Sequence, residues 1–528
     1  MGVEKYLAIA TLLFVILSGI GTAATLNVGG GGSGNYTTIQ AAINAANDTD
    51  TIIVYSGTYN ENVDVNKSVT IISESGNPDD TKVQAAFTDD HVFNVTRDNV
   101  TISGFNITGA TNYKIGIYLD EVRNNNISDN EVSSNYDGIN LYYSNNNTLI
   151  NNTASNNDEY GIEVYGSSNN TLINNNAFYN NYYGIYIYYS NNNMLNNNTA
   201  SYTDYDGILL DQSNNNMLIN NKAFNNYYIG IDLYGSSNNT LINNNASNNK
   251  EYGIELYESN NNTLDGNIAS YNNDYDGIAL YYSSNNILTN NSVSNNSYSG
   301  IYLYNSCNNK LNYNTVFNSG DDGIELYEQS NNNILDNNNV FDNTYGIFID
   351  YFCNNNILTN NNVSNNINHG IEVYYSNNNI LKGNVICNNN KSGIQFSYSD
   401  NNTIFNNFFN NTNNIGIDAS STNYIWNVTK MSGPNIVNGP NIGGNYWAHP
   451  NGTGHSQTCN DTNLDGFCDS QFDIDANNTD YLPLTLVEQE TGPVIHPQPN
   501  FDVPTANPLL IIGMLGFAVV LLLRREED

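Results

Sequence analysis

Hydrophobic and polar positions repeat along residues 116–430 with a period of 22–24 residues. After a Gly–Ile pair the residues alternate: Ile162 and Val164, for example, are separated by Glu163 and followed by Tyr165. Alternation with a period of two predicts a β-strand that buries one face. Further short apolar segments follow in each unit, and Asn-rich segments separate them. Because Asn tolerates left-handed backbone conformations and bonds to its own backbone, these segments are expected to be tight turns.

Fourteen Gly–Ile pairs mark this repeat. The glycines are Gly116, Gly138, Gly161, Gly184, Gly207, Gly230, Gly253, Gly277, Gly300, Gly323, Gly346, Gly370, Gly393 and Gly416. A unit of this length without helix formers is not a helical repeat. The strand pattern of leucine-rich repeats and the six-residue subperiod of left-handed β-helices are both absent. The sequence therefore predicts an all-β right-handed parallel β-helix, whose coils stack about 4.8 Å apart.

The interior of such a β-helix is predicted by the same alternation. Inward Ile, Leu and Val should form the core. Asn147, Asn170 and Asn193 hold the same place in successive units. We expect their side chains to stack inward as a ladder, each bonded to the equivalent residue one coil away.

The segment before the repeat is predicted to close the first coil. Tyr36–Ala46 has the pattern of a short amphipathic helix, and strands are expected at Thr51–Tyr55, Val63–Val65 and Val69–Ile72. We expect the helix to cover the open end of the first coil, because an exposed β-edge invites aggregation.

The N-terminus has the pattern of a secretory signal peptide. A short charged segment precedes an apolar stretch from Tyr6 to Gly21, and small residues end at Ala24. This pattern predicts cleavage after Ala24. An uncleaved N-terminal anchor is the alternative.

The C-terminus has the pattern of a surface anchor. Leu509–Leu523 is apolar and precedes Arg524 and Arg525, and half of the ten prolines lie in the spacer at 488–508. As a helix the apolar stretch would be about 22 Å long, shorter than a bilayer core of about 30 Å, and the Arg pair would stay inside. Spacer, apolar stretch and Arg pair resemble the C-terminal sorting signals of archaeal and bacterial surface proteins, although no Pro-Gly-Phe motif is present.

These features predict six parts of the chain. They are a signal peptide (1–24), an N-terminal cap with the first coils (25–115), the regular repeats (116–430), a C-terminal cap (431–487), a Pro-rich linker (488–508) and a transmembrane anchor or sorting signal (509–528).

Composition narrows the possible partners. The chain has 51 acidic against 14 basic residues and a formal net charge of −37. This balance excludes nucleic-acid binding, which needs clustered Lys and Arg. With 114 Asn and 41 Tyr the composition alone is typical of disordered tracts, but the ordered repeat overrides that interpretation.

Three segments resemble a known family. The stretch YTTIQAAINAANDTDTIIVYSGTYNENVDVNKSVTII, which begins at Tyr36, resembles the opening of pectin-lyase-like β-helix proteins. The unit GI-x-[LV]-x-x-S-x-N-x-L-x-x-N resembles their generic repeat. NYW, followed by D-x-N-x-D-G-x-x-D and YLPL, looks like the tail of NosD-like β-helix proteins. The resemblance covers residues 25–487 and implies the fold, but it leaves the function open, because the architecture hosts lyases, hydrolases, epimerases, adhesins and copper-related periplasmic proteins.

An acidic loop near the C-terminus is a candidate calcium site. Asp461, Asn463 and Asp465 place oxygens at positions 1, 3 and 5, Phe467 offers a carbonyl at position 7, and Asp469 stands at position 9. This spacing is typical of EF-hand-like or dockerin-like loops, although the bidentate Glu of position 12 is missing. An Asx-rich turn without metal is the alternative.

Two cysteines bracket part of this loop. Outside the cell Cys459 and Cys468 are expected to pair. Cys307 and Cys353 hold equivalent places two coils apart, which is beyond disulfide reach, and are expected to be small buried thiols.

An outward column of tyrosines is the candidate ligand-binding face. Strand alternation turns the residue four places after each repeat glycine away from the core. Rigid aromatic rows beside carboxylates suit stacking of glycans or contact with another protein. The alternative is that stacked Tyr rings only stabilise neighbouring strands. The column comprises Tyr142, Tyr165, Tyr188, Tyr234, Tyr257, Tyr281, Tyr304, Tyr327 and Tyr374.

Weaker candidates concern catalysis and copper. Asp321, Asp322 and His369 faintly resemble the paired Asp and the His of polygalacturonase-like hydrolases, but the companion Arg and Lys have no match. Coil counting separates His369 from Asp322 by about 10 Å. Turn acids and one polar His are the alternative. Copper, implied by the resemblance to NosD, prefers soft or imidazole ligands, and no Met cluster exists.

Together these patterns predict a secreted β-helix protein anchored at the cell surface. Its expected role is structural or adhesive, through binding of polysaccharide or surface protein along the tyrosine column. A polysaccharide lyase, hydrolase or epimerase is one alternative, and a NosD-like copper accessory protein is another.

Overall fold

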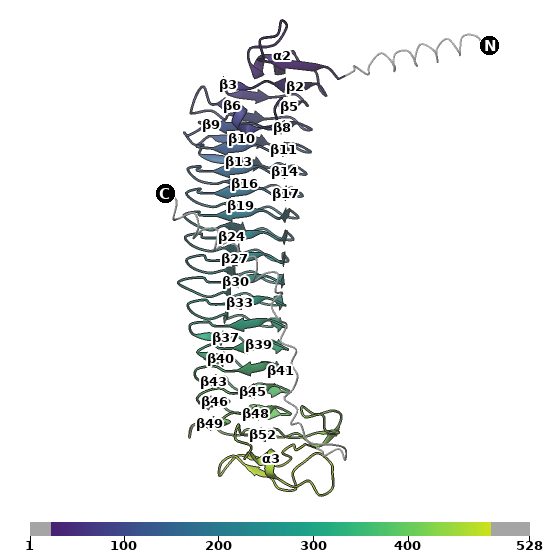
Figure 1. Ribbon diagram of the computed structural model, residues 1–528, viewed down its shortest axis with the longest axis vertical. Helices are drawn as coiled ribbons and strands as arrows, with labels where there is room; N and C mark the ends of the chain where they lie inside the picture. Colours follow the sequence, from purple (N-terminus) through teal and green to yellow (C-terminus); the bar gives the residue numbers. More distant parts are fainter. Residues whose placement is uncertain (1–22, 487–528) are drawn as a thin grey trace, which may run out of the picture. The chain divides into compact units, whose positions relative to one another are not determined.

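The computed structural model describes residues 23–486, which form one column of stacked coils (Figure 1). The expected signal peptide, apart from its last two residues, and the expected C-terminal anchor lie outside the described residues. Within residues 23–486 no helix is long and apolar enough to cross a membrane.

Each coil contributes one strand to each of three parallel sheets. In one coil β16 (Ile162–Tyr165), β17 (Thr171–Ile173) and β18 (Asn176–Phe178) belong to three different sheets, named here C, A and B. Every strand pairs in parallel with the equivalent strand one coil away: Ile162 of β16, for example, pairs with Ile185. The fold is therefore a parallel β-helix, and residues one repeat apart lie in straight columns.

Sheet C carries the candidate site and has 16 strands. They are β4 (Val63–Val65), β7 (Phe93–Val95), β10 (Ile115–Asp120), β13 (Asp137–Tyr142), β16, β19 (Ile185–Tyr188), β22 (Ile208–Asp211), β25 (Ile231–Tyr234), β28 (Ile254–Tyr257), β31 (Ile278–Tyr281), β34 (Ile301–Tyr304), β37 (Asp322–Tyr327), β40 (Tyr345–Ile349), β43 (Ile371–Tyr374), β46 (Ile394–Ser397) and β49 (Ile415–Ile417).

The repeat glycines are required by close packing between coils. The backbone at Gly161 is not in the left-handed region, but a Cβ there would lie 2.6 Å from the carbonyl oxygen of Gly184 and 2.9 Å from Cβ of Ala177. A side chain would therefore push neighbouring coils apart. The core beside it is apolar, and Ile162 and Val164 are fully buried.

The predicted Asn ladder is confirmed. The side chains of Asn147, Asn170 and Asn193 are each 1% exposed. The Asn170 Oδ1 accepts the backbone N–H of Asn147 at 2.8 Å, and the Asn193 Oδ1 accepts that of Asn170 at 2.8 Å. Exposed Asn residues at the turns, such as Asn169 with φ of 60°, hold left-handed conformations.

A Ser ladder runs beside the Asn ladder and explains one cysteine. Ser167 Oγ accepts the backbone N–H of Ser144 at 2.7 Å, and Cys353 holds this same place in its own coil, where its N–H donates to Ser376 Oγ at 3.1 Å. Cys353 is buried as expected. The prediction for Cys307 was wrong: it is only half-buried, because it follows Ser306 of the ladder and points away from the interior.

Both ends of the column are capped. The helix α2 (Ile39–Ala45) lies within the predicted range and buries Ile39 and Ile43 against the first coils. It is followed by β2 (Thr51–Val54), by β4 as predicted, and by β5 (Thr70–Ser73). The carboxylate of Glu61 accepts the N–H of Ile39 at 2.9 Å and therefore satisfies the start of the helix.

The C-terminal cap continues sheet B and seals the core with indole rings. β52 (Tyr446–Ala448) pairs in parallel with β48 (Phe408–Asn410), and the Trp447 ring stacks on Phe409 at 4.6 Å. The buried Asp480 carboxylate accepts the Trp447 Nε1–H at 2.9 Å. Around them lie β50 (Met431–Ser432), β51 (Asn441–Ile442), α3 (His455–Thr458), β53 (Phe472–Asp473) and β54 (Thr479–Asp480).

Candidate functional site

The outer surface of sheet C carries three columns of side chains, which lie one residue before, two residues after and four residues after each repeat glycine. We call this surface the tyrosine–carboxyl face. Strand alternation produces it, because Ile162 and Val164 point inward and Glu163 and Tyr165 outward from the same strand.

The predicted tyrosine column forms two contiguous rows. Tyr142, Tyr165 and Tyr188 are paired in register, and neighbouring rings lie 5.3 Å apart. Asp211 interrupts the column, since it pairs with both Tyr188 and Tyr234. The second row contains Tyr234, Tyr257, Tyr281, Tyr304 and Tyr327, with neighbouring ring centres 5.2–6.4 Å apart. Tyr374 lies beyond these rows, where it contacts Tyr351.

The carboxyl groups beside the tyrosines are more deeply buried than sequence reasoning expected. Asp232 and Glu255 are paired in register on adjacent strands, and Asp232 is only 8% exposed. Its Oδ1 has no hydrogen-bond partner among the described residues. The column one residue before the glycines adds Asp206, whose carboxylate accepts the N–H of Ile229 at 2.9 Å. The two aspartates are therefore buried within the face instead of rimming it.

Burial controls the charge of these acids. It raises the pKa of Asp206 to about 7 and that of Glu255 to about 8, and in Glu255 the nearby Asp206 adds to the effect. Burial and the same neighbours hold the pKa of Asp232 well above its usual range. Burial likewise raises the pKa of Glu163 to about 8. Near neutral pH much of this carboxyl set is protonated, so the face carries less charge than its sequence implies.

The catalytic candidates are not brought together. Asp322 is buried and Asp321 is exposed. Tyr345 pairs in register with Asp322, and its ring lies 6.0 Å from that of His369, so the Tyr stands between the acid and the imidazole. Burial lowers the pKa of His369 to about 4, and its Nδ1 lies 2.5 Å from Ser392 Oγ.

Asp322 has an acidic neighbour that the sequence did not indicate. Glu325 lies on the same strand, and burial together with the nearby charge of Glu325 holds the pKa of Asp322 well above its usual range. Ser299 joins this pair to Asp276: its Oγ donates to Glu325 Oε2 at 3.1 Å and its N–H to Asp276 Oδ1 at 2.7 Å. Burial raises the pKa of Glu325 to about 7 and that of Asp276 to about 8. The sequence did not predict that Asp322 and Glu325 are neighbours, because residues three apart in an ideal strand point to opposite faces.

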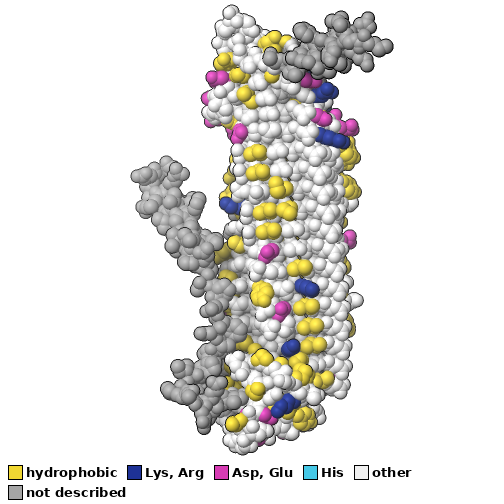
Figure 2. Space-filling model, turned by 90° about the vertical axis from the view of Figure 1, so that its right-hand side faces the viewer, with side chains coloured by type: hydrophobic (Ala, Val, Ile, Leu, Met, Phe, Trp, Pro, Cys, Tyr) yellow, Lys and Arg dark blue, Asp and Glu magenta, His cyan; other side chains and the backbone are white. Residues whose placement is uncertain are grey.

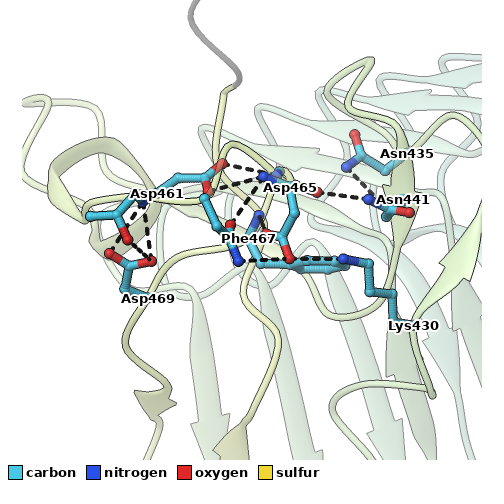
Figure 3. Close-up of polar contacts among 10 residues, drawn as sticks. Lys430, Asn435, Asn441, Asp461, Asp465, Phe467 and Asp469 are labelled. Carbon is cyan, nitrogen blue, oxygen red and sulfur yellow. Dashed lines mark hydrogen bonds and ion pairs between the residues drawn. The ribbon is translucent and has the colours of Figure 1, made fainter.

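The acidic loop is held by hydrogen bonds from its own backbone (Figure 3). Asp461 accepts the N–H groups of Asp465 and Gly466, at 3.1 and 2.9 Å. The Nζ of Lys430 donates to Asp465 Oδ2 at 2.8 Å. Asp469 instead accepts the N–H of Thr462 at 3.2 Å.

The remaining members of the predicted calcium site lie in the same loop. Asn463 Oδ1 accepts the N–H of Asp465 at 3.2 Å, and the Phe467 ring is buried, with Lys430 Nζ 5.3 Å from its centre. Within residues 23–486 no three His, Cys, Asp or Glu side chains are grouped so that they could hold a metal ion. Cys459 and Cys468 form a disulfide with a Cα–Cα distance of 5.5 Å.

A shallow groove on the outer surface of sheet B was not anticipated. It has a volume of about 550 Å³ and crosses three coils. The side of the column seen in Figure 2 is largely neutral polar surface with hydrophobic patches and few charged groups. The groove is lined by Asn174, Asn176, Phe178, Tyr179, Asn197, Thr199, Ser201, Tyr202, Lys222 and Phe224.

Two family models match the column. One, described as a right-handed β-helix region, matches residues 39–199, 90–246 and 160–275. The chain is a right-handed parallel β-helix protein. The other, the periplasmic copper-binding protein NosD, matches residues 270–452, which confirms the NosD-like resemblance over that region. The NosD match ends before the acidic loop at 461–469.

A third family model matches the C-terminus. It is described as the VPxxxP-CTERM archaeal protein sorting domain and covers residues 503–527. The pattern in its name occurs here as Val503-Pro504, three residues, and Pro508. The β-helix protein is therefore secreted and anchored at the surface through its C-terminal segment, as predicted. The predicted sorting signal is confirmed, and its prolines lie in the spacer at 503–508 instead of in a Pro-Gly-Phe motif.

The matching relatives cover only parts of the chain. A cell surface glycoprotein of Methanothermus fervidus is 35% identical over 137 residues, which is 25% of this chain and 21% of the relative. The periplasmic alginate epimerase AlgG matches with a TM-score of 0.38 and 18% identity, covering 52% of this chain and 73% of that structure. The Dettilon tailspike protein matches with a TM-score of 0.46 and 16% identity, covering 58% and 63%.

Proposed function

We propose that this surface-anchored protein is an adhesive β-helix that binds polysaccharide along its tyrosine–carboxyl face. The observation that carries the proposal is the second tyrosine row, in which Tyr234 and Tyr257 are parallel within 6° and 5.2 Å apart. Such rings are held rigidly by paired strands, and Tyr234 is 45% exposed. A row of fixed aromatic edges with phenol hydroxyl groups offers a pyranose chain apolar contacts for its C–H groups and hydrogen-bond partners for its hydroxyls.

The carboxyl groups support the same proposal. Protonated carboxyl groups both donate and accept hydrogen bonds. Glu255 is half-buried, so at neutral pH its partly protonated carboxyl can offer both kinds of partner to a sugar hydroxyl, whereas Asp206 and Asp232 are buried.

A glycan array with the full-length protein tests this function. Tyr234→Ala is expected to weaken binding of the glycan by roughly two- to tenfold, since one aromatic contact is worth about 0.5–1.5 kcal/mol. Tyr313→Ala is the matched control, because Tyr313 is 58% exposed but lies at a turn outside the face. Equal loss in both variants would refute polysaccharide binding along this face. So would binding to other proteins without binding to any glycan on the array.

A carbohydrate-active enzyme is the second candidate, and the Asp322–Glu325 pair favours it. Acid–base chemistry on a glycosidic bond requires two carboxyl groups, and the raised pKa values of Asp322 and Glu325 let one of them act as the acid. Asp322 is only 3% exposed, so a substrate would have to displace the side chains above it. Reducing-sugar and unsaturated-product assays test this candidate. Activity that disappears in Glu325→Gln would establish it, and inactivity on every glycan that binds would exclude it.

Calcium in the acidic loop remains a proposal as well. The loop offers oxygens from Asp461, Asn463, Asp465 and Asp469, and an incoming cation would have to displace the Lys430 ammonium from Asp465. The structure gives less support to copper binding, because the imidazoles near the NosD-like region already have partners. The Nδ1 of His449, for example, lies 3.0 Å from the carbonyl oxygen of Asn411.

A further inference from the structure

The groove on sheet B owes its shape to one serine. In the outward column at the third residue of each sheet B strand, Ser201 pairs in register with both Phe178 and Phe224. The two Phe residues therefore stand two coils apart, about 9.6 Å, with a small residue between them. The contrast is Phe317 and Phe341, which are direct neighbours in the same column and stack at 5.1 Å, filling the space between their strands.

We call the gap between Phe178 and Phe224, above Ser201, the notch. Its walls and floor suit a sugar ring. Tyr179 and Tyr202 follow the strands at left-handed turns, are 52% and 44% exposed, and lie 5.0 Å apart. On β21 (Thr199–Ser201) the half-buried Thr199 supplies a hydroxyl group, and the small Ser201 beside it, which is 4% exposed, forms the floor. Aromatic walls with a polar floor are the arrangement that receives the C–H faces and the hydroxyls of a pyranose.

The charge of the groove points to an acidic ligand. Lys222, on β24 (Lys222–Phe224), pairs in register with Thr199 and is exposed. The two ion pairs found within residues 23–486 involve Arg97 and Lys430, so Lys222 is unpaired there. No Asp or Glu lines the groove, although acidic residues outnumber basic ones by 51 to 14. A positive group kept clear of carboxylates in so acidic a protein attracts an anion.

We infer that this groove is a second saccharide site, which takes an acidic pyranose such as a uronic-acid unit, with its ring between Phe178 and Phe224 and its carboxylate at Lys222. It lies on a different sheet from the tyrosine–carboxyl face and does not depend on the function proposed for that face.

Titration calorimetry of the full-length protein with trigalacturonic acid and with its methyl ester tests the site. The two probes have the same shape and differ in charge. The acid is expected to bind roughly two- to fivefold more tightly at low salt, which is the range for an exposed ion pair, and Lys222→Gln should abolish this preference without changing binding of the ester. Lys310→Gln, at an exposed place on sheet A, should leave the preference intact.

Filling the notch tests its shape. Ser201→Phe would create the close Phe contact that Phe317 and Phe341 already make elsewhere, and both probes should lose binding. Ser270→Phe is the matched control, because β30 (Ile268–Ser270) lies in the same sheet and Ser270 has only serines beside it in this column. Circular dichroism verifies that both variants are folded. Equal binding of acid and ester by the wild type, no binding of either at millimolar concentration, or unchanged binding by Ser201→Phe would each overturn the inference.

Discussion

Removing one rung of the Asn ladder should weaken the column locally and strongly. In Asn170→Ala the carboxamide that links two coils disappears. Its Oδ1 accepts the backbone N–H of Asn147 at 2.8 Å, and its Nδ2 donates to the backbone carbonyl of Ser144 at 2.9 Å. Asn170 is 1% exposed, so water does not replace it without opening the coil.

The magnitude follows from the two groups left without partners. A buried polar group that loses its hydrogen bond costs about 1–3 kcal/mol, so the N–H of Asn147 and the carbonyl of Ser144 together cost roughly 2–6 kcal/mol. Coils contact only their neighbours, so the loss should be confined to the strands next to the rung. These are β14 (Thr148–Ile150), β17 and β20 (Met194–Asn196).

Native-state hydrogen exchange is the appropriate assay, because a repetitive column need not unfold in one step. At about 1.4 kcal/mol per factor of ten, the smallest expected loss speeds exchange of the β14 and β17 amides roughly 30-fold. Asn181→Ala is the control: Asn181 is exposed, and the structure gives its side chain no hydrogen bond. If exchange in β14 and β17 were the same in both variants, the Asn ladder would not carry the stability assigned to it.

Four further predictions concern other parts of the molecule. Gly161→Ala should lower the unfolding free energy by about 1–3 kcal/mol through overpacking, measured by denaturant titration; an unchanged midpoint would show that the coils can move apart freely. Because the folded-state pKa values of Asp232 and Glu255 are raised, the denaturation midpoint should fall as pH rises from about 4.5 to about 8, and Asp232→Asn should flatten that slope; a midpoint that rises over this range would contradict the assignment. If calcium binds the acidic loop, a chelator should speed hydrogen exchange there and Asp465→Ala should mimic it, whereas unchanged exchange without calorimetric calcium uptake would leave only an Asx-rich turn. Deleting residues 509–528 should release the protein into the medium, and retention on the cell would indicate another tether.

The fold could be predicted from the sequence because the repeat length of the sequence corresponds to one coil of the structure. One coil of a β-helix needs a fixed number of residues, so the Gly–Ile spacing reports the coil directly. The inward Asn could be placed for the same reason: Asn147 and Asn170 hold one register position in successive coils. Shifts of one residue relative to a ladder were harder to predict from the sequence. Cys353 falls on the Ser ladder, whereas Cys307 falls one residue beyond it and turns outward.

The candidate sites depended on neighbours that lie far away in sequence. Whether Asp232 is exposed depends on the tyrosines and acids of adjacent coils, and no single unit contains that information. The notch at Ser201 likewise exists only because two other coils present Phe on either side of it. Alternation predicts which way a side chain points. The size of the side chains on adjacent coils determines whether it is exposed, covered by a ring or placed in a groove.

The ladders also determine how the molecule responds to force. Backbone and Asn hydrogen bonds run from coil to coil, along the direction in which a pull on the two ends of the column would act. Tension would therefore load one junction at a time instead of shearing a whole sheet. Each released coil would add roughly 75 Å of extended chain. The column should thus yield in a series of similar steps and dissipate work at each.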